Sequence, residues 1–175
     1  MHDCRFFGDL VTLEECENKV VFFLNEKTFD FSQANKIRRF LIRDIPVYAV
    51  DTISVYKNSS AFTDEFLIKR IELIPVNPKN KEEVFELKKT GICRVYSDDI
   101  SDVFFPGIII TELQEGQEIF LRMSVRKGTF AEHVKFQTCH VGYKKEPNGF
   151  QITIHKEGYM SAIKIFEKMR KKFGL

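Results

Sequence analysis

The architecture can be worked out from FSQANKIRRFLIRDIP, residues 31–46. Apolar residues recur in it at steps of three and four, the spacing that gives an α-helix one apolar face. Asp30, just before it, suits a helix N-cap with Gln33 as capping-box partner, and Pro46 ends the run. The residues therefore predict an amphipathic helix. Its apolar stripe consists of Phe31, Ala34, Ile37, Leu41 and Ile45.

A second amphipathic helix is predicted from about Tyr159 to Lys172. Its apolar side comprises Ala162, Ile163, Phe166, Met169 and Phe173. The other positions are mostly basic, namely Lys164, Lys168, Arg170, Lys171 and Lys172. A sheet of few strands covers such helices on one side only. We therefore expect both stripes to lack full cover within the chain and to pack against the helices of a partner.

Short segments rich in β-branched and aromatic residues lie between these helices and predict strands. They are Val20–Leu24, Val47–Tyr56, Val84–Leu87, Ile92–Tyr96, Ile108–Leu113 and Glu118–Val125, followed by a hairpin of Val141–Lys145 and Phe150–His155. A further helix begins near Asp64 and ends before Pro75. Helices at both ends with strands between them predict an α+β fold, with two amphipathic helices on a small antiparallel sheet.

The composition limits the classes of function. The chain has 175 residues, of which 43% are hydrophobic and 30% charged, so it can form one domain or two small ones. Its net charge of +2 is too small for nucleic-acid binding by bulk charge. Four scattered cysteines indicate a reducing compartment, and no signal peptide or membrane-spanning segment is evident. We expect an intracellular protein with no membrane contact.

No catalytic, metal or cofactor site is predicted. His133, Cys139 and His140 match no standard zinc spacing. The acidic loop with Asp98, Asp99 and Asp102 offers three carboxylates of the kind that bind magnesium, but a capped turn is the favoured interpretation. Phosphate-binding loops and common hydrolase motifs are absent from the sequence. The alternative left open is a free-standing nucleic-acid-binding module that uses the basic C-terminal helix.

Residues 32–76 resemble the assembly subunit of multisubunit RNA polymerases. This family includes the bacterial α N-terminal domain, the archaeal D subunit and the third-largest subunit of eukaryotic RNA polymerase II. The matching positions are Ala34-Asn35, Arg38-Arg39, Pro46, Ala49, Asp51, Asn58, Ser60, Asp64-Glu65-Phe66, Arg70 and Ile74-Pro75. The resemblance continues more weakly through Ser97–Ile100, Glu115–Glu118, Gly128–Phe136 and His155–Leu175.

The chain departs from the family pattern in several places. Eukaryotic members carry a cysteine cluster after the Ile-Pro motif, whereas residues 76–83 contain no cysteine, so we expect no zinc there. Four isolated cysteines do not support the iron–sulfur cluster of some archaeal members. Pro147-Asn148-Gly149 stands where the family often has a long insertion. The result is a compact version of the subunit, which would suit a large DNA virus.

The resemblance implies a dimerisation domain of residues 1–45 and 141–175 and an inserted β-rich domain of residues 46–140. It implies a non-catalytic subunit of DNA-directed RNA polymerase without cofactor, which acts as an assembly scaffold in transcription by heterodimerisation. The implied partners are a smaller homologous subunit, the second-largest subunit and small assembly subunits, with DNA contacted only indirectly; a homodimer stays open. The location would be nuclear or cytoplasmic, or the virion of a virus. The partner-binding residues implied are Phe31, Ala34, Asn35, Ile37, Arg38, Arg39, Leu41, Ile163, Phe166, Met169 and Phe173.

Overall fold

The computed structural model describes residues 5–7, 10–77 and 84–175. The described residues form three α-helices and three antiparallel sheets, so the predicted α+β class is confirmed. The chain divides into two compact units. The first unit comprises Met1–Pro46 and Thr129–Leu175, and the second unit comprises Val47–Gly128. Among the described residues, none of the helices is both long enough and apolar enough to span a bilayer.

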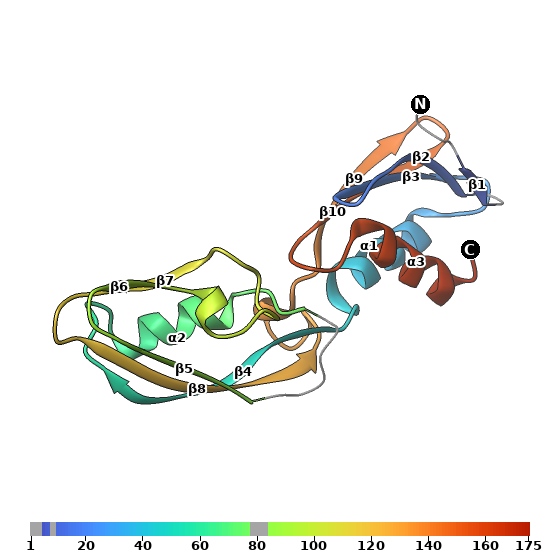
Figure 1. The fold of residues 1–175 in the computed structure, drawn as a ribbon. Coiled ribbons are helices and arrows are strands. Elements are labelled where there is room, and N and C mark those ends of the chain that lie inside the picture. Colours follow the sequence, from blue (N-terminus) through green and yellow to red (C-terminus); the bar gives the residue numbers. More distant parts are fainter. Residues whose placement is uncertain (1–4, 8–9, 78–83) are drawn as a thin grey trace. The chain divides into compact units, whose positions relative to one another are not determined.

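The first unit is a five-stranded sheet with two helices on one face (Figure 1). The strand order is β1 (Arg5–Phe7), β2 (Leu10–Glu15), β3 (Lys19–Asn25), β10 (Gly149–Lys156) and β9 (Cys139–Glu146). The helices are α1 (Phe31–Arg43) and α3 (Ala162–Phe173), which contact each other. Strands from both ends of the chain therefore pair in one sheet, because β3 aligns with β10.

Helix α1 begins where its capping box predicts. The Asp30 carboxylate accepts the Gln33 backbone N–H at 2.7 Å, and the Gln33 side-chain oxygen accepts the Asp30 N–H at 2.9 Å. Two otherwise unpaired backbone donors are satisfied in this way. The helix ends at Arg43, two residues before the buried Ile45.

Helix α3 begins later than predicted, at Ala162 and not near Tyr159. The Ser161 hydroxyl accepts the Lys164 N–H at 3.3 Å and serves as the N-cap. At the other end Gly174 has φ of 70°, a left-handed conformation that glycine adopts without a steric penalty and that commonly ends helices.

The second unit has its own sheets and its own core. Its three-stranded sheet has the order β4 (Val47–Asn58), β8 (Glu118–Gly128) and β5 (Val84–Thr90), and a two-stranded sheet pairs β6 (Cys93–Tyr96) with β7 (Ile109–Leu113). Helix α2 (Asp64–Glu72) contacts β4 and β7 (Figure 1). Its apolar side, with Leu67 and Ile71, is fully buried in a cluster that also includes Leu87 and Leu121.

Residues 129–140 lie in the first unit, whereas the sequence analysis assigned them to the insertion. The reason is a set of hydrogen bonds to first-unit backbone. The Ala131 N–H donates to the Arg43 carbonyl at 3.3 Å, and the Glu157 N–H donates to the Thr138 carbonyl at 2.8 Å. This stretch includes a short 3₁₀ helix, η2 (Val134–Phe136), whose Phe136 is buried.

Two strands were not predicted, β1 and β2. Strand β2 pairs with β3 through a bulge between Thr12 and Glu14. Its inward residues are Leu10 and Thr12, and Glu14 and Glu15 follow them. A bulge and a buried threonine interrupt the simple alternation by which strands are recognised.

Candidate partner-binding surface of the first unit

The residues predicted to bind a partner separate into a buried and an exposed group. The buried group has at most 2% of each residue exposed, and it comprises Ala34, Ile37, Leu41, Phe166 and Met169. These side chains face the sheet and the other helix; the rings of Phe22 on β3 and Phe166 on α3 lie 5.0 Å apart. The expectation that the stripes lack full cover within the chain is therefore wrong for these five residues, which lie in the core of the first unit.

The exposed group lies at the edges and outer faces of the helices. Phe31 is 66% exposed, Phe173 is 37% exposed and Arg39 is exposed, while Asn35, Arg38 and Ile163 are half-buried. The two phenylalanines belong to the predicted stripes, but each stands at an end of its helix, where the sheet covers less of it. Of the residues predicted to bind a partner, those of this group are accessible to one.

One edge of α1 carries an aromatic cluster. The Phe31 ring lies 6.2 Å from the ring of Tyr143 on β9 and 6.4 Å from that of Phe150 on β10. The Tyr143 and Phe150 rings stack at 5.6 Å, and the Lys145 ammonium lies 4.5 Å from the Phe150 ring centre. Sheet residues thus support Phe31 from below, which leaves most of its ring open to solvent.

The Tyr143 hydroxyl is buried and has no hydrogen-bond partner within the described residues. Burial raises the pKa of Tyr143 above its usual value, against the opposing charges of Lys145 and Arg38. The phenol therefore keeps its proton at neutral pH and can donate a hydrogen bond. Arg38 donates from Nε to the Asn35 side chain at 3.2 Å, which fixes its guanidinium along the helix.

The other edge of α1 meets the end of α3. The rings of Phe40 and Phe173 contact edge to face, with centroids 5.6 Å apart and an interplanar angle of 87°. Phe40 is half-buried and was not among the predicted residues. Its position three residues after Ile37 was the available signal, because such a spacing places it beside the stripe.

The histidines and cysteine considered as metal ligands have other roles. His133 accepts the Lys135 N–H at 3.2 Å, and His140 lies 3.0 Å from the Glu157 carboxylate. The Cys139 thiol is buried against the Leu41 carbonyl at 3.2 Å, and burial raises its pKa to about 11. A protonated thiol is a poor metal ligand. Within the described residues no group of three or more potential ligands is close enough to hold a metal.

The acidic loop of the second unit is engaged in local structure. Asp98 accepts the Gly107 N–H at 2.8 Å, and Asp99 accepts the Tyr96 N–H at 2.8 Å. Burial alone would raise the pKa of Asp99, but its bonds with Lys89 and with the Tyr96 N–H outweigh burial and lower it. These contacts agree with the capped-turn interpretation of the loop.

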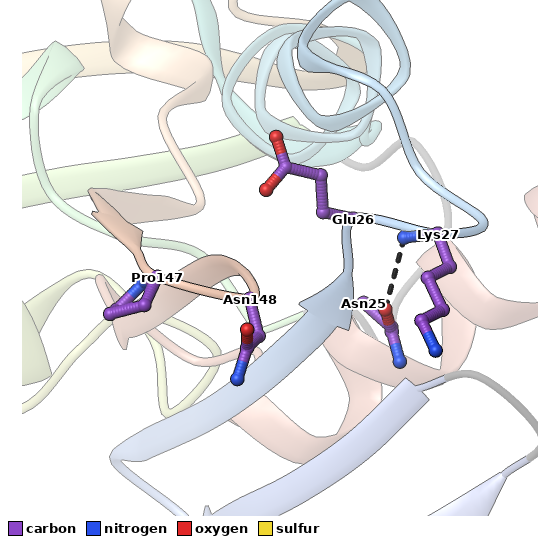
Figure 2. Close-up of a pocket in the computed structure, with 5 residues that line it drawn as sticks. All are labelled: Asn25, Glu26, Lys27, Pro147 and Asn148. Atoms are coloured by element: carbon purple, nitrogen blue, oxygen red, sulfur yellow. Dashed lines mark hydrogen bonds between the residues drawn. The ribbon is translucent and has the colours of Figure 1, made fainter.

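An open pocket lies at the end of the first unit's sheet, between the β3–α1 loop and the β9–β10 turn (Figure 2). Its lining comprises Asn25, Glu26, Lys27, Pro147 and Asn148. The Asn25 side chain accepts the Lys27 N–H at 3.0 Å, and the Glu26 N–H donates to the Asn148 carbonyl at 2.9 Å. These bonds hold the two turns together, so the polar lining has a structural role.

Comparison with known protein sequences places this chain in a family, although no protein-family model matches it. The chain is similar to DNA-directed RNA polymerase subunit Rpo3 of Methanocaldococcus jannaschii, with 34% identity over 146 residues. That match covers 78% of this chain and 76% of the relative. The chain belongs to the Rpo3 family of DNA-directed RNA polymerase subunits. The resemblance seen in the sequence is thus confirmed, and the family is a non-catalytic one.

Two further relatives show how widely the Rpo3 family extends. Rpo3 of Pyrococcus furiosus is 30% identical over 181 residues, covering 93% of this chain and 67% of the relative. Subunit 3 of RNA polymerases II, IV and V of Arabidopsis thaliana is 27% identical over 164 residues, covering 68% of this chain and 51% of the relative. The chain therefore spans about half the length of the plant subunit.

Proposed function

We propose that this Rpo3-family chain is an assembly subunit, whose first unit pairs with a smaller homologous polymerase subunit. The observation that carries the proposal is the match to archaeal Rpo3 over most of the chain, together with exposed aromatic residues on the two helices. In this proposal the pair docks the second-largest subunit and small assembly subunits, inside the cell, and contacts DNA only indirectly.

Two aromatic positions are the proposed anchors for the smaller subunit. Phe31 stands on the Tyr143 and Phe150 rings at one edge of α1, and Phe173 contacts Phe40 at the other. Exposed aromatic rings already held by neighbouring rings lose little freedom on binding, and such residues often dominate interface energies.

The two arginines of α1 have different roles in this proposal. Consecutive helical residues point about 100° apart. Arg38 lies beside the aromatic edge, tied to Asn35, and would flank the contact with the smaller subunit. Arg39 is exposed on the outer face and can hold a carboxylate or backbone carbonyls of the second-largest subunit through its planar group of donors.

Stepwise co-purification tests the proposal. The chain is co-expressed with the smaller homologous subunit and then incubated with the second-largest subunit. We expect Arg39→Ala to leave the smaller subunit bound and to lower recovery of the second-largest subunit. Lys127→Ala, an exposed cation of the second unit, is the control and leaves both recoveries unchanged. Failure of the wild-type chain to bind either subunit would refute the proposal.

A further inference from the structure

We propose that the outer face of the second unit's three-stranded sheet is a binding site for single-stranded RNA. The inner face of this sheet, with Leu87 and Leu121, packs in the core of the unit. Successive strand residues point to opposite faces, so Lys88 on β5, Phe120 on β8 and Tyr56 on β4 share the outer face. The site lies in the second unit and is additional to the pairing role proposed for the first unit.

These three side chains form a stack that is open at the Tyr56 end. The Tyr56 and Phe120 rings stack with centroids 4.9 Å apart and an interplanar angle of 26°. The Lys88 ammonium lies 5.7 Å from the Phe120 ring centre. Strand β4 is an outer strand of the described sheet, and Tyr56 is 59% exposed. Because a second ring already holds Tyr56, a nucleobase can stack on its exposed side with little loss of side-chain freedom.

Two cations flank the stack on the same face. Lys88 is exposed beside Phe120, and Arg122 follows two positions along β8 with 53% of its side chain exposed. The nearest carboxylate to Arg122 belongs to Glu86 on β5, and the ion pair is loose, with 3.8 Å from the Arg122 Nε to the Glu86 oxygen. Both cations can therefore bind the phosphate next to a stacked base. This local arrangement does not require a strongly basic chain, which the net charge of +2 excludes.

Hydroxyl groups on the same face favour RNA over single-stranded DNA. Ser54 on β4 is exposed and lies opposite Arg122 in the strand register. Thr52 lies opposite Ser124, and their hydroxyl oxygens are 2.6 Å apart. Hydroxyl groups can donate to or accept from the ribose 2′-hydroxyl, by which proteins distinguish RNA from DNA. The face thus combines a stacking surface, cations and hydroxyls, which suit the base, phosphate and ribose of a nucleotide.

A protein is a less favoured occupant of this face. The centre of a protein interface is depleted of charged residues, whereas several outward residues here are charged or polar. They are Thr52, Ser54, Glu86, Lys88, Arg122 and Ser124. The exposed apolar area is limited to the aromatic pair and to Val84 at the start of β5.

Fluorescence anisotropy of a labelled uridine octamer with the full chain tests the inference. We expect saturable binding that weakens as the salt concentration rises. Tyr56→Ala should weaken binding roughly tenfold, whereas Tyr56→Phe keeps the ring and should stay within about twofold of wild type. The control Phe66→Ala removes a ring that is 48% exposed on α2 and should also stay within about twofold.

A second pair of variants tests the cations. Lys88→Gln should weaken binding roughly threefold at about 50 mM NaCl and should make the affinity less dependent on salt. Lys127→Gln changes the charge equally at an exposed residue near the end of β8 and should have neither effect. A deoxyuridine octamer, which lacks only the ribose 2′-hydroxyls, should bind the wild-type chain roughly threefold or more weakly than the uridine octamer.

Lack of saturable binding to the uridine octamer would overturn the inference. Equal losses of affinity for Tyr56→Ala and Phe66→Ala would overturn it as well, and so would equal or tighter binding of the deoxyuridine octamer. Addition of the second-largest polymerase subunit provides the last comparison. If it abolished RNA binding and increased hydrogen-exchange protection in β4 and β8, the face would be a protein interface and not an RNA site. Failure of the smaller subunit to bind would refute the proposed function and leave this inference intact.

Discussion

The helices of the two units bury their apolar sides in the same way but use their outer faces differently. Helix α2 has two basic and three acidic residues, and its cations are engaged within the second unit. Arg70 donates to the Ile109 carbonyl at 2.5 Å and lies 5.7 Å from the Phe62 ring centre, and Lys69 pairs with Glu72 at 2.9 Å. Helices α1 and α3 are basic and carry exposed rings, and Lys36, Arg39, Lys164, Lys171 and Lys172 are exposed cations that form no ion pair within the described residues. In the proposed function α2 serves its own unit, whereas α1 and α3 also contact a partner.

The largest effect is expected from charges placed in the two cores. Ile37→Asp should destabilise the first unit by about 4 kcal/mol, because the side chain is 1% exposed and the new carboxylate has no counter-ion there. Ile71→Asp should do the same to the second unit. Amide hydrogen exchange read segment by segment shows which unit loses protection. Loss of partner binding by Ile37→Asp with unchanged protection of α1 and α3 would contradict the assignment of Ile37 to the core.

A smaller effect is expected from exposed aromatic residues. Phe173→Ala should weaken binding of the smaller subunit about tenfold, or about 1.4 kcal/mol, because an anchoring ring is lost at the edge of α1. Tyr56→Ala removes a ring that is 59% exposed in the second unit and should leave the affinity within about twofold. Titration calorimetry measures both. Equal losses of affinity for Phe173→Ala and Tyr56→Ala would contradict the proposal that the first unit, and not the second, binds the smaller subunit.

Arg39 of α1 and Arg70 of α2 should differ in how much each contributes to the stability of its own unit. Arg70→Ala should destabilise the second unit by about 1 kcal/mol, through loss of the Ile109 hydrogen bond and of contacts with the Phe62 and Phe66 rings. Arg39→Ala should change stability by less than about 0.5 kcal/mol, because the side chain is exposed. Urea unfolding followed by circular dichroism provides the comparison. A larger destabilisation by Arg39→Ala than by Arg70→Ala would show that Arg39 stabilises its own unit.

The smallest effect is a pH dependence confined to the second unit. The pKa of Asp99 is lowered from its ordinary value of 3.8, so its stabilising contribution is complete above that value and is lost as pH falls through the lower folded pKa. The contribution should be under about 1 kcal/mol, because the Lys89 partner is partly exposed. Asp99→Asn should therefore make the free energy of unfolding of the second unit less dependent on pH near and below pH 3.8. If the variant and the wild type lose stability equally as the pH falls, the Asp99–Lys89 ion pair contributes nothing to stability.

The sequence predicted α1 well because the signals there are local. The capping box at Asp30 and the spacing of Ala34, Ile37 and Leu41 involve residues a few positions apart. The sequence did not show what covers the stripe of α1, because that cover comes from β9 and α3, which are distant in the chain. The spacing of apolar residues does not reveal whether an apolar helix face packs against the sheet of its own chain or against a partner. The proposed anchors Phe31 and Phe173 were predicted only as members of the apolar stripes, and Phe40 was not predicted.

Hydrogen exchange of the full chain, alone and with the smaller homologous subunit, tests the central claim most directly. The account predicts that binding of the smaller subunit increases protection in α1 and α3, at the segments that contain Phe31, Phe40 and Phe173, and leaves α2 unchanged. Increased protection centred on α2, with α1 and α3 unaffected, would contradict it.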